Sequence, residues 1–181
     1  WAESDMYFNV TATREAALGK FYHRRHLLWE DAQPVVRGNR DTMYSSAVFD
    51  LEAGPVTITL PDSGKRFMSL MMLDEDQYAF DVKYDAGKYT YNKDQVGTRY
   101  ILAAIRTLVN PADAADLKAA HALQDAVMIQ QKSTGKFEIP EWDQASQQKV
   151  RKAVKDLGET INNFNNAFGP KDQVDPVQHL I

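Results

Sequence analysis

The first of two polar clusters that could bind or activate a ligand lies in the first quarter of the chain. It comprises Arg37, Asn39, Arg40 and Asp41, with Tyr44 shortly after. An arginine fork can hold a carboxylate through two parallel hydrogen bonds, and an asparagine amide both donates and accepts. The cluster could therefore bind an anionic or sugar-like ligand. The alternative, which we favour, is a structural network in which Asp41 pairs with an arginine and fixes a turn.

The second cluster is the acidic run Asp74–Asp76, which Gln77 and Tyr78 follow. Its carboxylates could ligate a hard cation, or Glu75 could work as an acid or base with a raised pKa. Adjacent strand residues point to opposite faces, so at most two of the three acids could serve one site. We favour the simpler interpretation, a solvated turn. Arg99 could reach either cluster if the strands that carry them are neighbours.

Familiar catalytic signatures are missing from the sequence. It has no cysteine among its 181 residues, which excludes disulfides, thiolate nucleophiles and cysteine-ligated metals. It also has no nucleophile elbow, phosphate-cradling glycine loop or His-Glu-x-x-His zinc motif. His23 and His26 would share a face of a helix, but no third ligand lies nearby, so we interpret them as surface residues. We therefore expect neither a metal nor another cofactor.

Charge and hydropathy exclude two classes of partner. The formal net charge is −4, and no segment forms a basic block that could track phosphates, which argues against nucleic acid. The longest run of large apolar residues, Leu70–Leu73, is far too short to cross a bilayer, so we expect no transmembrane segment.

The elements that must position these clusters follow from residue periodicity. Residues 1–36 predict a helical or irregular lead-in, with a short helix that Ser4 or Asp5 caps and that turns Met6 inward. Residues 37–108 alternate apolar and polar side chains and predict six antiparallel strands. These strands lie near 43–51, 56–60, 67–73, 78–84, 89–91 and 99–108, with a hairpin-type connection at Asp85–Gly87.

Residues 109–181 change to helical periodicity. Asn110 and Pro111 predict the start of a helix that continues to Gln131. A second helix is expected from Asp143 to Phe168, because Val150 begins an apolar stripe at steps of four and three that should pack on the sheet. The fold class is α+β: an antiparallel β-sandwich core with a helical or irregular lead-in and two C-terminal amphipathic helices.

A family resemblance emerges from several segments taken together. They are Asn39–Leu51, Gly54–Pro61, Asp74–Asp76, Val96–Tyr100 and His121–Asp125. In combination they resemble the bacterial family called domain of unknown function 1254, over nearly the whole chain. Gln77 departs from that pattern, because many relatives are expected to carry histidine there.

The resemblance carries expectations of its own. It implies a β-sandwich with helical flanks in a protein exported to the periplasm. It also implies a C-terminal jelly-roll domain, domain of unknown function 1214, in the same parent protein, with Val174–Ile181 at the linker to that domain. The family has no settled activity, although some members have been put forward as hydrolases.

Three hypotheses about function remain open, and whether the protein is an enzyme is part of the question. The first is a small-molecule or saccharide-binding domain that works together with the jelly-roll domain. The second is a hydrolase with its site between the two domains, Glu75 as acid or base and Arg40 as anion stabiliser. The third is an envelope scaffold that binds a partner through the Val150–Phe168 face. The ligand-binding candidates are Arg37, Asn39, Asp41, Tyr44, Tyr78 and Arg99.

Overall fold

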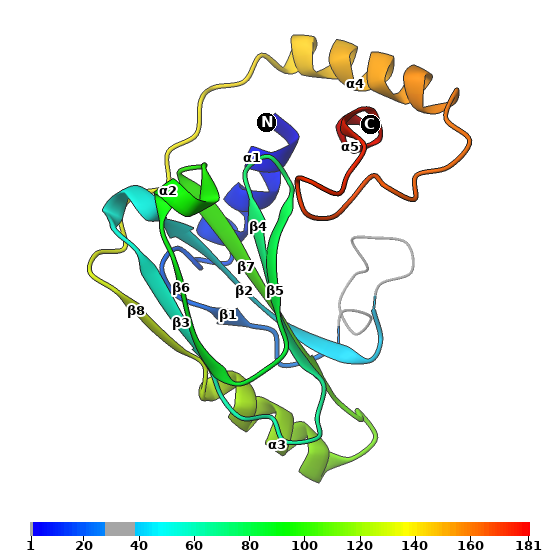
Figure 1. Ribbon diagram of the computed structural model, residues 1–181. Helices are drawn as coiled ribbons and strands as arrows, with labels where there is room; N and C mark the ends of the chain where they lie inside the picture. Colours follow the sequence, from blue (N-terminus) through cyan, green and yellow to red (C-terminus); the bar gives the residue numbers. More distant parts are fainter. Residues whose placement is uncertain (1, 28–38) are drawn as a thin grey trace.

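The computed structural model describes residues 2–27 and 39–181, which form two antiparallel β-sheets with helices around them (Figure 1). One sheet has the strand order β1-β2-β7-β4-β5 and the other β6-β3-β8. The strands of the first sheet are β1 (Tyr22–His23), β2 (Thr42–Asp50), β7 (Tyr100–Leu108), β4 (Met68–Asp74) and β5 (Ala79–Lys83). Those of the second are β6 (Gly87–Tyr91), β3 (Val56–Leu60) and β8 (Met128–Gln131). The predicted α+β sandwich is confirmed.

The main core lies between the two sheets. Alternate residues of β2, β4 and β7 point toward β3, because side chains of a strand alternate between its faces. Phe49, Leu70 and Ile105 from the large sheet and Ile58 from the small sheet are all fully buried there. Each such side chain contributes about 1.5–3 kcal/mol through removal from water. This shared core holds the sheet ends, and the loops that they carry, in fixed positions.

The N-terminal segment covers the opposite face of the large sheet. Helix α1 (Ala2–Asn9) continues into a π-helical turn, Val10–Arg14, and Phe8 packs there against Val48 and Tyr100. The prediction that Met6 points inward is wrong, since Met6 is 45% exposed. Phe8 takes that place because it, and not Met6, faces the sheet.

Helix α3 (Ala114–Asp125) covers one end of the sandwich, next to Met43. Its N-cap is Asp113, whose side chain accepts hydrogen bonds from two backbone N–H groups of the first turn. The predicted start at Asn110 and continuation to Gln131 are both wrong. Residues 128–131 form β8 instead, because the open edge of β3 offers backbone partners there and Ile129 packs on the core.

The connection at Asp85–Gly87 also differs from the prediction. It is not a hairpin, because β5 pairs with β4 in the large sheet whereas β6 pairs with β3 in the small one. The chain therefore crosses between the sheets at this point, and the short helix α2 (Lys93–Val96) returns it to β7. The described residues form eight strands, two more than predicted, with β1 and β8 contributed by the flanking segments.

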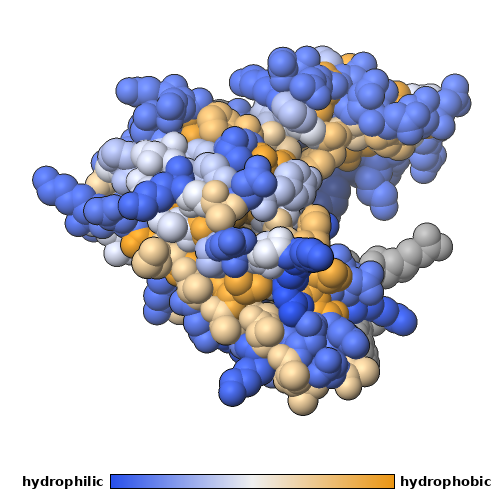
Figure 2. Space-filling model, turned by 60° about the horizontal axis from the view of Figure 1, so that its bottom comes forward, coloured by the Kyte–Doolittle hydropathy of each residue, from blue (hydrophilic) through white to orange (hydrophobic). Residues whose placement is uncertain are grey.

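The C-terminal segment forms an arm above α1 in Figure 1, made of α4 (Gln144–Gly158) and α5 (Pro176–Leu180). The predicted helix to Phe168 ends ten residues early, where Gly158 and a polar, asparagine-rich stretch disfavour helix. Burial of its stripe against the sheet is also wrong, since Val150 and Phe168 are 59% and 57% exposed. Figure 2 shows this arm as hydrophilic along its outer edge, with hydrophobic residues beneath. No helix among the described residues is long and apolar enough to cross a membrane.

Candidate functional site

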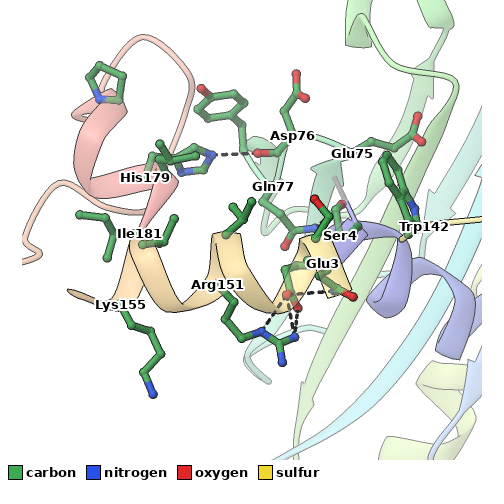
Figure 3. Close-up of a pocket in the computed structure, with 18 of the residues that line it drawn as sticks. Glu3, Ser4, Glu75, Asp76, Gln77, Trp142, Arg151, Lys155, His179 and Ile181 are labelled. Carbon is green, nitrogen blue, oxygen red and sulfur yellow. Dashed lines mark hydrogen bonds and ion pairs between the residues drawn. The ribbon is translucent and has the colours of Figure 1, made fainter. Parts of the chain in front are cut away.

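A cavity of about 1010 Å³ lies between α1, the β4–β5 turn, α4 and α5 (Figure 3). Its walls therefore come from three parts of the chain that are distant in sequence. The polar lining residues are Glu3, Ser4, Glu75, Asp76, Gln77, Tyr78, Trp142, Asp143, Ser146, Gln147, Arg151, Lys155 and His179. Apolar residues complete the wall: Ala2, Val150, Val154, Pro176, Leu180 and Ile181.

The β4–β5 turn forms one wall because Asp74 organises it. The Asp74 carboxylate accepts a hydrogen bond from the backbone N–H of Tyr78 at 2.9 Å. Gln77 adopts a left-handed backbone conformation with φ of 67°, and its side-chain amide donates to Ser4 Oγ at 2.8 Å. Burial raises the pKa of Asp74 above its ordinary value, against the opposing effect of the Tyr78 N–H. The hydrogen bond between Gln77 and Ser4 attaches this turn to α1.

Glu75 places a half-buried carboxylate beside this turn. Its Oε2 accepts a hydrogen bond from the backbone N–H of Tyr100 at 2.9 Å. Burial raises the pKa of Glu75, and the negative charges of Asp5 and Asp76 add to the rise, while the backbone N–H of Tyr100 opposes it. A carboxyl group of this kind can hold or release a proton nearer to neutral pH than an exposed one.

Helix α4 is joined to α1 by a charged contact across the cavity. Arg151 Nη2 donates to both oxygens of Glu3, at 2.6 and 2.7 Å, and Gln147 donates to the same carboxylate at 3.0 Å (Figure 3). The hydrogen bond from Arg151 lowers the pKa of Glu3. Nearby, the indole Nε1 of Trp142 donates to Asp5 at 2.7 Å, which fixes the ring at the entrance to α4.

Helix α5 closes the remaining side through His179. Its ring stacks on Tyr78, with centroids 4.1 Å apart and planes 11° apart. The two ring nitrogens lie 2.9 Å from the carbonyl oxygen of Ala167 and 2.8 Å from that of Asp76. Lys171 lies over the Tyr78 ring, 5.4 Å from its centroid. The stack therefore ties the C-terminal segment to the β4–β5 turn.

The lining combines features that recognise small polar molecules. Aromatic rings offer faces for stacking, and amide, hydroxyl and carboxylate groups offer fixed hydrogen-bond partners. Metal ligation is less well supported, because no three His, Asp or Glu residues in the described part of the chain are arranged to hold an ion. The arrangement can therefore bind an organic ligand and can present the Glu75 carboxyl group to it.

Only some of the residues that were singled out in the sequence lie at the cavity. Glu75 and Tyr78 both line the cavity. Arg40 does not join them: β2 and β7 pair antiparallel over nine residues, and Arg40 precedes one end, whereas Glu75 binds Tyr100 at the other. Roughly 26 Å of strand separates them. The structure thus does not bring together the acid and the anion stabiliser of the hydrolase hypothesis.

The first polar cluster stays at the far end of the sheet. Asn39 accepts hydrogen bonds from the backbone N–H groups of Asp41 and Thr42, at 2.8 and 3.2 Å, and so fixes the start of β2. Asp41 is exposed, and its carbonyl accepts from the backbone of Val109. Tyr44 is half-buried under Arg106, whose guanidinium carbon lies 5.2 Å from the ring centroid. Arg37 lies outside the described residues.

Arg99 reaches neither predicted cluster with its side chain. It binds the buried carboxylate of Asp50 and extends to Glu52 and Glu138. His23 lies in β1, not on a helix, with Nδ1 2.7 Å from Ser45 Oγ. His23 and His26 therefore do not share a helical face.

Sequence reasoning missed Glu3, Gln147, Trp142 and His179, which lie in the lead-in and the C-terminal segment. Their side chains converge only because α1 and the α4–α5 arm pack at the same end of the large sheet. The one local signal was Trp142, an aromatic residue directly before the N-cap Asp143.

Comparisons with known proteins agree with this fold. The model of a family described as "Protein of unknown function (DUF1254)" matches residues 18–131. No curated protein matches the chain. The crystal structure of the VPA0106 protein from Vibrio parahaemolyticus is similar, with a TM-score of 0.71 and 15% sequence identity. The similarity covers 99% of this chain but 61% of that protein, so the chain spans about three fifths of its length.

Proposed function

This chain belongs to the DUF1254 family of proteins of unknown function, and we propose that it is a small-molecule-binding domain whose ligand is a saccharide or a similarly polar compound. The observation that carries the proposal is the cavity of about 1010 Å³ beside Glu75. Its volume suits a mono- or disaccharide, since ligand pockets usually measure about 300–1,000 Å³.

The chemistry of the lining supports a polyhydroxylated ligand. Trp142 is 39% exposed, and the hydrogen bond to Asp5 holds its ring in one orientation. A fixed aromatic face can stack on the apolar face of a sugar ring at little entropic cost. Gln147 and the carboxylates of the β4–β5 turn provide partners for hydroxyl groups.

A thermal-shift screen tests the proposal, because a ligand that prefers the folded state raises the melting temperature. Saccharides at a hundred times their Kd should add about 2.7 kcal/mol to the free energy of unfolding. Gln147→Ala should weaken the shift, because Gln147 lines the cavity, whereas the exposed neighbour Gln148 offers a matched control as Gln148→Ala. The absence of any shift at millimolar saccharide would refute the proposal.

Hydrolysis is a second candidate function, favoured by the raised pKa of Glu75. A carboxyl group with a raised pKa can act as a general acid or base. Arg40 cannot assist at this site, so we assign the hydrolase hypothesis to Glu75 alone. Full-length protein screened against ester, amide and glycoside substrates should show turnover that Glu75→Gln reduces at least a hundredfold. Turnover unchanged by Glu75→Gln would remove this site from consideration.

The scaffold hypothesis draws support from exposed apolar residues of α4 and of the segment that follows it. Val150 and Phe168 remain more than half exposed, as a partner-binding surface requires. Replacement of both by serine should abolish capture of an envelope partner without lowering the melting temperature, because neither is buried. If capture persists in that double variant, another surface is responsible.

We also propose that the domain works outside the cytoplasm beside a C-terminal jelly-roll domain, as the family resemblance implies. The greater length of the similar Vibrio protein is compatible with such a second domain. Fractionation of cells that express the native gene would test export, and recovery of the protein only in the cytoplasm would refute it.

A further inference from the structure

We infer that the ligand carries a protonated amine, as an amino sugar does, and that Glu75 binds this amine beside the indole of Trp142. The inference rests on the proposed function, since it names the chemical class of the ligand that the cavity takes. Its basis is the surroundings of Glu75, a half-buried carboxylate of the cavity wall that lies beside the Trp142 indole (Figure 3).

The charge on Glu75 is not balanced from within the described part of the chain. Its Oε2 accepts the backbone N–H of Tyr100, but the carboxylate forms no ion pair with any basic side chain there. The charged groups that act on it are Asp5 and Asp76, both acidic. A partly buried carboxylate among like charges is costly, and a cation beside it would offset that cost.

Trp142 and Asp5 extend this negative region. Asp5 is only 6% exposed, and the Trp142 indole donates to its Oδ2 at 2.7 Å. The face of an indole attracts cations, and of the aromatic side chains tryptophan does so most strongly. An ammonium group between the indole and Glu75 would therefore meet a carboxylate on one side and a π-face on the other.

Neither Arg151 nor Lys155 of α4 forms an ion pair with Glu75. Arg151 is already bound to both oxygens of Glu3. Lys155, one turn further along α4, extends away from Glu75 in Figure 3. An ammonium group needs fewer acceptor groups around it than a metal ion needs ligands, which fits a region where no three metal-ligating side chains of the described chain converge.

Isothermal titration with three matched sugars tests the inference: glucosamine, N-acetylglucosamine and glucose. Only the first carries a charge at neutral pH. We expect glucosamine to bind at least about tenfold tighter than the other two, as a hydrogen bond to a charged group predicts. Glu75→Gln should reduce this preference to about twofold, whereas Gln148→Ala, on the exposed face of α4, should leave it unchanged. Circular dichroism of the variant shows whether it is folded.

The wild-type protein provides a second readout that does not depend on the variant. Because burial raises the pKa of Glu75, its carboxylate gains a proton at a higher pH than an exposed glutamate does. The affinity for glucosamine should then fall toward acid pH more steeply than that for glucose. Equal affinities for the three sugars at neutral pH would overturn the amine inference and leave saccharide binding intact. Failure of all three to bind would refute both.

Discussion

The guanidinium of Arg99 binds the buried carboxylate of Asp50 through two hydrogen bonds, Nε to Oδ1 at 3.2 Å and Nη2 to Oδ2 at 3.0 Å. The two residues occupy neighbouring strand ends, since Asp50 ends β2 and Arg99 directly precedes β7. The backbone N–H of Lys136 donates to the same carboxylate at 3.1 Å. The contact therefore joins the end of the large sheet to the segment that leads toward α4.

Arg99→Ala should lower the free energy of unfolding by about 3 kcal/mol, because it leaves a buried carboxylate without its cation. The Asp50 side chain is 2% exposed, so its charge depends on partners within the protein. Lys152→Ala is a matched control, since its ion pair with Asp156 is largely exposed and should contribute about 0.5 kcal/mol or less. Urea denaturation measures both. If the two variants lost the same free energy of unfolding, burial of the Arg99–Asp50 pair would not make it stronger than an exposed pair.

Acid should destabilise the fold in part through Asp50. Burial alone would raise its pKa, but the hydrogen bonds from Arg99 and from the backbone of Lys136 and Glu52 outweigh burial and lower it. A carboxyl group with a lowered folded-state pKa adds stability above its unfolded pKa of about 3.9, and this contribution is lost as the pH falls further. Asp50→Asn should therefore be destabilised at pH 7, and its deficit relative to wild type should shrink below about pH 4. A deficit that is the same at both pH values would contradict this account.

A side chain at Gly135 is predicted to destabilise the fold. The φ of this glycine is +70°, and a Cβ atom would lie 2.5 Å from Asp50 Oδ2, inside the contact that Arg99 stabilises. Gly64 is a control with a similar φ of +60° but open space around it. Gly64→Ala should cost about 1 kcal/mol for the backbone alone, and Gly135→Ala about 2–3 kcal/mol because the clash is added. Thermal melts of the two variants give the comparison, and equal shifts would mean that the carboxylate can move aside.

Gln124 should be the most sensitive polar residue of α3. Its side-chain amide is fully buried and donates to Ser45 Oγ at 3.2 Å and to the carbonyl of Arg24 at 3.1 Å. Gln124→Ala leaves these acceptors without a donor and should cost about 2–4 kcal/mol. Lys118→Ala, on the exposed face of the same helix, should change stability by about 0.5 kcal/mol or less. A loss below 1 kcal/mol for Gln124→Ala would imply that water replaces the amide.

The sheet was predictable where its signal is local. Val56, Ile58 and Leu60 alternate with polar residues, and this alternation by itself predicts a strand with one buried face. The pairing of the strands was not predictable in the same way, because it depends on strands that are distant in the sequence. Asp85–Gly87 has the composition of a hairpin turn, yet the strands on either side of it belong to different sheets. Residues 128–131 continue a helical pattern, but β3 recruits them as its edge neighbour.

The residues of the candidate site were likewise predictable only where the signal in the sequence is local. Glu75 and Tyr78 stand out in the sequence because an acidic run next to an apolar strand is visible locally. Gln147 and His179 carry no such signal, since their role arises when the arm of α4 and α5 packs near α1. The apolar stripe of α4 was visible, but periodicity does not tell whether a stripe is buried by the same chain.

Ionisation of Glu75 should lower the free energy of unfolding as the pH rises, whereas ionisation of Asp50 should increase it. Burial raises the pKa of Glu75, with Asp5 and Asp76 adding to the rise, so the folded state retains a proton that the unfolded state releases. The penalty is absent below the unfolded pKa of about 4.3 and complete above the raised folded pKa. Glu75→Gln is neutral at every pH, and its amide oxygen can still accept the Tyr100 N–H. The variant should therefore gain stability relative to wild type between pH 4 and pH 8, as measured by urea denaturation, and parallel curves for the two proteins would show that Glu75 is better solvated than its position implies.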